Sequence, residues 1–429
     1  MSKHYNVLVL GSGGREHAIG WKLNQSRYLG QLFFGPGNAG TASIGKNIPV
    51  DINDFISVKK NLIKYKIDIL VIGPENPLVN GISDKCNSDP ETSNVIVIGP
   101  KKRGAMLEGS KSYAKSFMQK YEIPTARYKN FNAENSEEAK MYLEELSAPF
   151  VVKADGLAAG KGVYICQSIE EAKVAVDKIT VGLKFGEAGK KIVIEEFLDG
   201  KEISVFILTN GTEYKVLPIA QDYKRIGEND TGPNTGGMGA VSPVSFVDSE
   251  LIKKITQQII KPTIYGIKKE KIEYTGFIFF GLMIVKGQPY VIEYNARLGD
   301  PETQAIIPLI DSDLLELFIK IKKNSEFVSL KLKIKTLISL TVILSSGGYP
   351  EKYNSGYKIT GIDQVEDLIV FHAGIEEKNN CLFTSGGRVL AITSLGKNFK
   401  DSLEKAYNGL KKIHFKDMYY RSDIGKNSR

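Results

Sequence analysis

Short apolar runs, separated by polar segments with helical spacing, dominate the first hundred residues. The runs are rich in Val, Ile, Leu and Phe and end in turns of Gly and Pro, at residues 5–10, 31–35, 68–73 and 94–99. Strands covered on both faces have this continuous apolar pattern. The intervening segments, such as 16–23 and 54–66, have helical spacing, so the pattern predicts a doubly wound parallel sheet over residues 1–103. Ligands of such sheets bind beyond the strand C-termini.

A different arrangement follows residue 103. We expect one helix over 104–121, interrupted by Pro124, and then a compact unit over 124–190 with helices at 136–146 and 168–179 and strands at 149–154 and 163–167. Strands are predicted next at 191–198, 202–209, 213–220, 277–285 and 289–295, and a β-rich region with a helix near 400–412 follows residue 330. The chain is therefore predicted to be a multidomain α/β and α+β protein, divided into 1–103, 104–330 with the small subdomain 124–190, and 331–429.

Charge and cysteine content narrow the classes of protein that fit. The 429 residues carry a formal charge of +8, but Lys is scattered among Glu and Asp. This pattern favours an ordinary solvated surface first and small anionic substrates, attracted by electrostatic steering, second; nucleic acid comes third. Three widely separated cysteines are typical of reduced thiols and predict a cytoplasmic protein. The longest apolar run, 276–285, is too short for a membrane helix, and the first strand is unlike a signal peptide.

The turn GSGGREH, after the first predicted strand, resembles a dinucleotide-binding fingerprint without matching it. Glu16 stands where that fingerprint needs its third glycine. Gly11, Gly13 and Gly14 nevertheless expose backbone N–H groups at a helix N-terminus, which suits an anion. A tight turn without a ligand explains the motif equally well.

The stretch KADGLAAGKGV, residues 153–163, is a second Gly-rich loop. It fails the Walker A pattern, because only three residues separate Gly156 from Gly160 and Gly162 follows Lys161. Lys153 ends an apolar strand, and a buried lysine is costly unless an anion pairs with it. The sequence therefore indicates a phosphate site of another design; the alternative is a hairpin turn with Lys161 at the surface.

The segment VIEYNARLGDPETQ, residues 291–304, concentrates polar groups at a strand end. Glu293 and Asn295 are two apart and so point to one face, where a carboxylate and an amide oxygen suit Mg²⁺. Arg297 can clamp a carboxylate or phosphate, and Asp300 and Glu302 follow in the turn.

The segment 221–240 is long, polar and rich in glycine, which is typical of a functional loop. Asp222, Lys224 and Arg225 place both signs of charge at its start, as a zwitterionic substrate requires; the alternative is a mobile lid without direct contacts. The four histidines, His4, His17, His372 and His414, have no metal-binding spacing, so zinc is not expected.

Ten stretches, in the same order over nearly the whole chain, resemble the phosphoribosylamine–glycine ligase family of the ATP-grasp superfamily. TGPNTGGMGA and RLGDPETQ are the most specific to this family. They lie within the stretches DTGPNTGGMGA and EYNARLGDPETQ, and the others are VLGSGGREHA, GPGNAGTA, GPENPLVNGI, LEGSKSYAK, KADGLAAGKGV, IVIEEFLDG, SGGRVLAITSLG and YYRSDIG.

The resemblance implies an N-terminal pre-ATP-grasp domain, a central ATP-grasp pair of subdomains with ATP between them, and a C-terminal α+β domain. It implies Mg²⁺ or Mn²⁺ on Glu293 and Asn295, although Gly281 stands where many relatives in the superfamily have a further acid. The ATP-binding residues that it implies are Lys111 and Lys153 on the phosphates, Gly160, Lys161 and Gly162 in a flap, Glu195, Glu196, Phe197 and Leu198 at adenine, and Glu202 at ribose.

The implied reaction joins glycine to 5-phosphoribosylamine with ATP, through glycyl phosphate. The candidate catalytic residues are Arg297, Lys153 and Asp222. The candidate substrate-binding residues are Gly13, Gly14, Asn38, Glu75, Asp222, Lys224, Arg297, Gly299, Asp300 and Pro301. We expect a monomer or weak homodimer, without nucleic acid or membrane partners.

Three alternatives remain open from the sequence. The first is another ATP-grasp carboxylate–amine ligase with a different acceptor. The second is an NAD-dependent oxidoreductase, suggested by GSGGRE, and the third is a binding protein for anionic polymers, suggested by the charge of +8.

Overall fold

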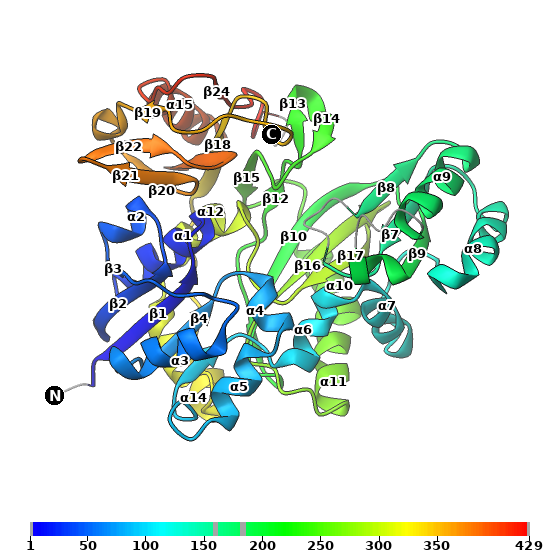
Figure 1. The fold of residues 1–429 in the computed structure, drawn as a ribbon, viewed down its shortest axis with the longest axis horizontal. Coiled ribbons are helices and arrows are strands. Elements are labelled where there is room, and N and C mark those ends of the chain that lie inside the picture. Colours follow the sequence, from blue (N-terminus) through cyan, green and yellow to red (C-terminus); the bar gives the residue numbers. More distant parts are fainter. Residues whose placement is uncertain (1–2, 158–161, 181–185, 427–429) are drawn as a thin grey trace.

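The protein contains several sheets that are arranged around one central sheet. The structure, a computed structural model, describes residues 3–157, 162–180 and 186–426. Figure 1 shows the N-terminal and C-terminal parts together on one side of the molecule and a small sheet with α8 and α9 on the other. Strands β10, β16 and β17 lie between them.

The N-terminal strands form a parallel sheet, as predicted. It has five strands in the order β3-β2-β1-β4-β5, and the short strand β3 was not predicted. Alternate residues of β1 enter different cores, because successive side chains of a strand point to opposite faces: Val7 and Val9 enter one, Leu8 and Leu10 the other. The elements are β1 (Tyr5–Gly11), α1 (Gly14–Leu23), β2 (Leu29–Pro36), α2 (Ala39–Ala42), β3 (Lys46–Asn47), α3 (Phe55–Lys64), β4 (Ile69–Ile72), α4 (Glu75–Val79), α5 (Ile82–Ser88) and β5 (Ile96–Ile98).

The single helix predicted over 104–121 is wrong, because the chain forms two helices there. α6 (Lys102–Gly109) and α7 (Lys111–Lys120) meet at Ser110, which has an extended backbone with φ −144° and ψ 116°. The Ser110 hydroxyl accepts a hydrogen bond from the Tyr113 N–H and donates to the Asp155 carboxylate. Serine at an N-cap favours such a break, since it satisfies a free N–H of the new helix.

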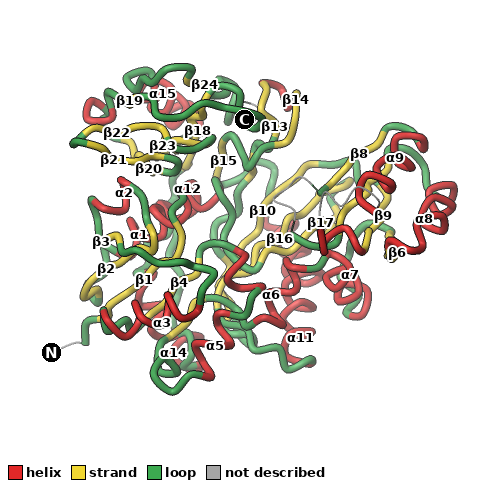
Figure 2. Tube along the Cα trace, viewed as in Figure 1, coloured by secondary structure: helices red, strands yellow, loops and turns green. Residues whose placement is uncertain are grey.

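A four-stranded antiparallel sheet, in the order β6-β9-β7-β8, follows α7. Its strand β9 begins only after residue 190, where we predicted the small subdomain to end. Helices α8 and α9 pack on this sheet around one apolar core (Figure 2). The elements are β6 (Tyr128–Asn132), α8 (Ser136–Tyr142), β7 (Phe150–Ala154), β8 (Val163–Cys166), α9 (Ile169–Thr180) and β9 (Lys191–Glu196).

The central antiparallel sheet has the order β11-β10-β16-β17 and two covered faces. Ile203 and Val205 pack with the helices α10 and α11, whereas Phe206 and Leu208 share a core with Val7 and Val9 of the N-terminal sheet. The elements are β10 (Lys201–Thr209), β11 (Tyr214–Val216), α10 (Ser249–Ile255), the π-helix Thr256–Ile260, α11 (Lys261–Lys269), β16 (Gly276–Val285), β17 (Gln288–Asn295), α12 (Glu302–Ile306), α13 (Leu314–Lys320) and α14 (Asn324–Ser329).

Segment 221–240 is not the long loop that we predicted. It forms β12 (Gln221–Asp222), β13 (Arg225–Gly227), β14 (Thr231–Asn234) and β15 (Gly239–Ser242). β12 and β15 join the C-terminal strands in the sheet β12-β15-β18-β23-β20, so the C-terminal domain holds this segment in place. The remaining elements are β18 (Ile338–Ser346), β19 (Lys358–Ile359), β20 (Leu368–His372), β21 (Ile375–Lys378), β22 (Cys381–Thr384), β23 (Arg388–Gly396), α15 (Phe399–Leu410) and β24 (Met418–Tyr419).

Neither a disulfide bond nor a membrane-spanning helix is part of the described structure. Cys86, Cys166 and Cys381 are all free. Within the described ranges, every helix is too short or too polar to cross a membrane.

Candidate active site

Two lysines predicted to hold phosphate lie close together near the end of β7. Lys153 is 5% exposed, and its Nζ lies 2.8 Å from Oε1 of Glu195. Lys111, at the start of α7, donates from Nζ to the carbonyl oxygen of Gly156 at 3.1 Å. Burial lowers the pKa of Lys111, and the positive charge of Lys153 lowers it further. The Glu293 carboxylate opposes both effects but does not outweigh them. The concentration of positive charge suits a ligand with several negative charges.

Strand β17 carries the carboxylate and the amide predicted to bind a metal ion. Among the described residues, no group donates a hydrogen bond to the Glu293 carboxylate. Its burial opposes ionisation, but the nearby lysines, Lys224 before Lys153 and Lys111, outweigh burial and lower the pKa. Two residues on, Nδ2 of Asn295 is buried without a hydrogen-bond partner. An ionised carboxylate with free oxygens fits a divalent cation that shares its coordination with phosphate.

Gly281 lies directly opposite Glu293 where β16 pairs with β17. A Cβ at residue 281 would lie 3.1 Å from Cγ of Glu293, so a larger side chain there would displace the glutamate. On the next strand Ser204 pairs with Gly281, and its Oγ donates to Oε1 of Glu302 at 2.9 Å. The acid that approaches this part of the sheet therefore comes from α12 rather than from β16.

Glu202, predicted at the ribose, and Lys224, predicted at the substrate, form an ion pair with each other. Burial opposes the charge of Lys224, but Glu202 and then Glu293 outweigh burial and raise its pKa. The structure thus joins the predicted nucleotide and substrate residues into one charged cluster.

A second group of carboxylates lies where β12 approaches the turn after β17. Oδ1 of Asp222 is buried without a hydrogen-bond partner. Burial raises the pKa of Asp222 well above its usual range, and the neighbouring Glu302 carboxylate raises it further. Gly237 and Gly299 make room for this group: a Cβ at Gly237 would lie 2.3 Å from Cδ of Pro301, and one at Gly299 would lie 2.4 Å from Oε2 of Glu302. Such a pair of buried carboxylates favours a cationic partner.

Asp300 is held by arginines from the two terminal domains. Burial opposes the charge of Asp300, but Arg388 and Arg15 lower its pKa. Arg388, from β23, donates to the Asp300 carbonyl oxygen at 2.7 Å and also to the carbonyl oxygen of Gly236. Gly13 faces the same carboxylate, since a Cβ there would lie 3.4 Å from Oδ2 of Asp300. All three domains therefore meet at this residue.

Arg297 faces two acidic side chains of the N-terminal half. Its Nη2 lies 2.8 Å from Oε1 of Glu108, and its Nε lies 3.4 Å from Oε2 of Glu75. Burial opposes the ionisation of Glu75, but Arg297 lowers its pKa. Two predicted substrate residues, Arg297 and Glu75, are thereby brought together.

The side chain of Glu16 occupies the glycine turn before α1. It accepts a hydrogen bond from the Gly13 N–H at 2.7 Å and another from Arg15 Nε at 2.6 Å. A Cβ at Gly11 or at Gly73 would lie 2.6 Å or less from this side chain. Because a carboxylate already lies at the helix N-terminus, a dinucleotide pyrophosphate cannot occupy the position that the fingerprint provides. Gly14, the first residue of α1, lies against Gln304 instead.

Both polar atoms of the Asn38 side chain form hydrogen bonds within the protein. Its Oδ1 accepts hydrogen bonds from the N–H groups of Gly40 and Thr41, and its Nδ2 donates to the carbonyl oxygens of Ser12 and His372. This residue therefore joins the glycine turn to the C-terminal domain.

The predicted adenine segment, Glu195 to Leu198, continues from the end of β9. Both carboxylate oxygens of Glu195 face lysines, whereas Glu196 accepts a hydrogen bond from the Arg127 N–H at 2.8 Å. Phe197 and Leu198 follow the strand and are half-buried. In the flap, the carbonyl oxygen of Gly162 accepts from the Ala154 N–H at 2.8 Å; Gly160 and Lys161 lie outside the described residues.

Sequence reasoning missed Glu108, Lys115 and Arg388, which are all charged and near the site. Lys115 stands four residues after Lys111 on α7, a spacing that could have indicated a shared helix face. Arg388 stands in the SGGRVL stretch, but its partners are more than eighty residues away in sequence. No local pattern shows such a contact.

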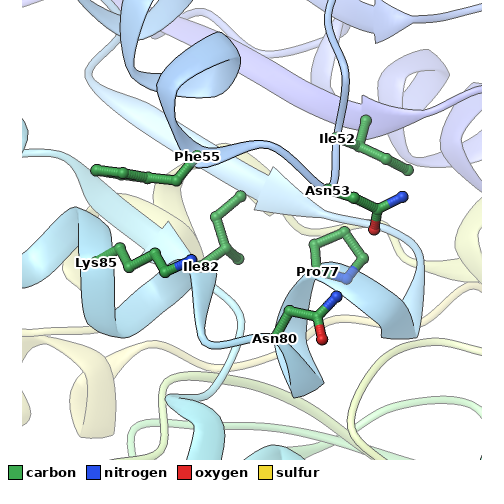
Figure 3. Close-up of a pocket in the computed structure, with 7 residues that line it drawn as sticks. All are labelled: Ile52, Asn53, Phe55, Pro77, Asn80, Ile82 and Lys85. Atoms are coloured by element: carbon green, nitrogen blue, oxygen red, sulfur yellow. The ribbon is translucent and has the colours of Figure 1, made fainter.

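A crevice in the N-terminal domain holds none of the predicted site residues. It lies between the segment before α3 and the helices α4 and α5 (Figure 3), and its volume is about 10 Å³. That volume is near the minimum for one water molecule. Its lining residues are Ile52, Asn53, Phe55, Pro77, Asn80, Ile82 and Lys85.

A small antiparallel sheet carries Lys153, and a central antiparallel sheet carries the free carboxylate of Glu293. This part of the chain has the fold of the ATP-grasp class of enzymes. The same fold occurs in the biotin carboxylase domain of Hydrogenobacter thermophilus 2-oxoglutarate carboxylase. That structure aligns with a TM-score of 0.72 at 16% identity, covering 98% of this chain and 92% of the other.

The particular family follows from closer similarities. Three phosphoribosylglycinamide synthetase domains match the chain: the N domain at residues 5–108, the ATP-grasp (A) domain at 109–303 and the C domain at 339–427. The phosphoribosylamine–glycine ligase of Caldanaerobacter subterraneus subsp. tengcongensis is 43% identical over 418 residues, 97% of this chain and 99% of that protein. The crystal structure of the Thermotoga maritima phosphoribosylamine–glycine ligase aligns with a TM-score of 0.84 at 38% identity, covering 98% of this chain and all of the other.

This chain belongs to the phosphoribosylamine–glycine ligase family. It is an ATP-dependent ligase that forms a C–N bond in purine biosynthesis.

Proposed function

We propose that this enzyme joins glycine to 5-phospho-D-ribosylamine and forms glycinamide ribonucleotide, ADP and phosphate. The observation that carries the proposal is the convergence of Lys111 and Lys153 on the charge of Glu293, next to the acidic group of Asp222 and Glu302. The first group has the charges that a nucleotide triphosphate and a cation need. The second is a pair of buried carboxyl groups, and an amino acid's ammonium group would favour their charged form.

The reaction proceeds in two steps through glycyl phosphate. A glycine carboxylate oxygen attacks the γ-phosphorus of ATP, and ADP leaves. The amine nitrogen of phosphoribosylamine then attacks the acyl carbon, phosphate leaves with the bridging oxygen, and one amine proton is released. Little covalent chemistry is left to the protein, so its contribution is positioning and charge stabilisation.

Lys111 and Lys153 hold the nucleotide phosphates in this proposal, with Gly160, Lys161 and Gly162 closing over them. Adenine binds along Glu195–Leu198, and Glu202 receives the ribose. Glu293 and Asn295 hold Mg²⁺ or Mn²⁺. When bound, the cation neutralises charge on the transferring phosphoryl group.

Asp222 or Asp300 holds the glycine ammonium, beside Gly299 and Pro301. Arg297 lies near the reacting carboxylate, and the pairing of its guanidinium with Glu75 and Glu108 fixes its direction. The acceptor's phosphoribosyl part lies against Gly13, Gly14, Asn38 and Glu75, with Lys224 between the two substrates. Because the side-chain hydrogen bonds of Asn38 are all made within the protein, Asn38 contributes to acceptor binding by fixing the turn at Ser12.

The domain division at 1–103, 104–330 and 331–429 belongs to the same proposal, with the small subdomain extended from 124 to the end of β9. We also propose a cytoplasmic monomer or weak homodimer.

ADP release tests this function directly. Phosphoribosylamine, formed in solution from ribose 5-phosphate and ammonia, is mixed with enzyme, ATP, Mg²⁺ and glycine. We expect stoichiometric ADP release only when glycine and acceptor are both present. Release with another amino acid, or with glycine and a different amine at a higher kcat/KM, would replace the proposed substrates.

A further inference from the structure

Three fully buried charged side chains form a row beneath the predicted phosphate site. Lys115 is 2% exposed, Glu195 is 3% exposed and Lys153 is 5% exposed. The Glu195 carboxylate lies between the two ammonium groups: Oε1 is 2.8 Å from Lys153 Nζ, and Oε2 is 2.9 Å from Lys115 Nζ. Nothing in the nucleotide site described above assigns a role to Lys115.

The row connects the small sheet to the strand that carries the metal-binding pair. Lys153 and Glu195 lie on the same face of the paired strands β7 and β9, diagonal to each other. Lys115 comes from α7, and its Nζ donates to Thr125 Oγ1 at 2.7 Å. Thr125 Oγ1 in turn donates to the carbonyl oxygen of Val291 in β17, also at 2.7 Å. Lys115 is therefore anchored to both sheets.

The position of Lys115 determines how much of the positive charge of Lys153 remains available to a ligand. With one lysine, the Glu195 carboxylate would neutralise Lys153 entirely. With two lysines the row has a net charge of +1, because Lys115 pairs with the second oxygen of the Glu195 carboxylate. Burial lowers the pKa of Lys115 to about 8, although Glu195 opposes this effect. Because a buried ion pair is weak evidence for stability, a role in positioning explains the arrangement better.

We propose that Lys115 is a positioning residue for the nucleotide: by binding the second oxygen of Glu195, it directs Lys153 toward the phosphates and preserves its charge. Lys115 does not touch the nucleotide in this proposal, which rests on the proposed function only for the place of the phosphates. It also assigns the Glu195 carboxylate to Lys153 rather than to adenine.

The test is nucleotide binding by Lys115→Met, which keeps the length of the side chain and removes its charge. We expect the Kd for ATP to rise roughly tenfold, the equivalent of one charge-assisted contact, and the Kd for adenosine to stay unchanged. Lys120→Met, on the exposed side of the same helix, is the control and should bind both as the unchanged protein does. Equal losses for ATP and adenosine would show a merely structural role and overturn the proposal.

A double variant, Lys115→Met with Glu195→Gln, tests the charge argument itself. Removing the carboxylate frees Lys153 again, so affinity for ATP should recover most of the loss. A double variant as weak as Lys115→Met, with unfolding unchanged by circular dichroism, would contradict the proposal. Both measurements omit glycine and the acceptor, so they succeed or fail independently of which substrates the enzyme joins.

Discussion

Lys153 is the residue on which nucleotide binding depends most in this account. Replacing it with Met removes the buried ammonium group and leaves Glu195 paired with Lys115. We expect the Kd for ATP to rise by more than about tenfold, since a charge-assisted contact is lost, while the fold persists. Isothermal titration calorimetry measures this change. Lys191→Met, an exposed lysine of the same sheet, should leave the Kd unchanged; an unaltered Kd for the Lys153 variant would refute its role.

In the proposed function, Glu293 is the corresponding residue for the metal ion. The change Glu293→Gln keeps the shape of the side chain and removes its charge, so we expect turnover to collapse and half-saturation with Mg²⁺ to need far more metal. A titration of activity against Mg²⁺ at saturating ATP measures both effects. Glu273→Gln, at an exposed ion pair with Lys101, is the control. A titration curve identical to that of the unchanged enzyme would remove Glu293 from the metal site.

Which of these residues can be read from the sequence depends on how far away their partners are. Glu293 and Asn295 could be paired in advance, because the two-residue period of a strand fixes their common face. That Lys153 needs an anion could be predicted because it ends an apolar strand, and the anion beside it in the structure is the Glu195 carboxylate. Arg388 could not be identified, since Asp300 reaches it only through tertiary folding. For Lys115, the spacing from Lys111 indicates a shared helix face, but the contact with Glu195 again depends on tertiary folding.

The break between α6 and α7 is the element that sets the position of Lys111. Ser110 caps α7 and holds Asp155, so Ser110→Ala should lower the free energy of unfolding by about 1 kcal/mol. It should also raise the Kd for ATP, because Lys111 follows the cap directly. Urea denaturation and calorimetry provide the two values.

A matched cap far from the site separates these effects. Asn398 caps α15 through the Asp401 N–H, and Asn398→Ala should cost similar stability without changing the Kd for ATP. If both variants bind ATP equally well, the cap at Ser110 has no influence on the site.

Elements were predictable where the local pattern agreed with the final packing. In the apolar runs of β1, β4 and β5, the local pattern and the final packing both favour a strand. In α3 and α9 they both favour a helix. Segment 221–240 misled the prediction because its polar, Gly-rich composition is typical of loops. It becomes β12 and β15 only because β18 of the C-terminal domain supplies hydrogen-bond partners.

Buried polar contacts hold the three domains together. One of these contacts predicts that the stability of the protein depends on pH. His17 of α1 accepts a hydrogen bond at Nδ1 from the His372 N–H of β20, at 2.9 Å. Burial lowers the pKa of His17 to about 3, with His372 adding to the effect, and burial lowers the pKa of His372 to about 4. Both are thus neutral in the folded protein at neutral pH.

Between pH 6.5 and about 4 the unfolded chain binds more protons at these residues than the folded one. Stability should therefore fall as the pH is lowered through this window, by up to about 1.4 kcal/mol per pH unit for each histidine. His17→Gln should flatten the dependence relative to His4→Gln, an exposed control. Thermal unfolding at several pH values measures it, and parallel curves for the two variants would contradict the prediction.

The shared core at the scale of the whole molecule was beyond sequence reasoning. Val7 of the N-terminal sheet and Phe206 of the central sheet lie in the same apolar cluster. Each has the pattern of an ordinary strand residue, and nothing local indicates that their faces meet. The order of the domains could be predicted, but not the way in which they close around Asp300.

The central claim is that glycine is activated as glycyl phosphate and then transferred to the amine of phosphoribosylamine. Glycine labelled with ¹⁸O in both carboxylate oxygens tests it in one turnover, because the bridging oxygen must leave with phosphate. We expect one ¹⁸O in inorganic phosphate and one in the amide product, measured by mass spectrometry. Phosphate without ¹⁸O would contradict the account.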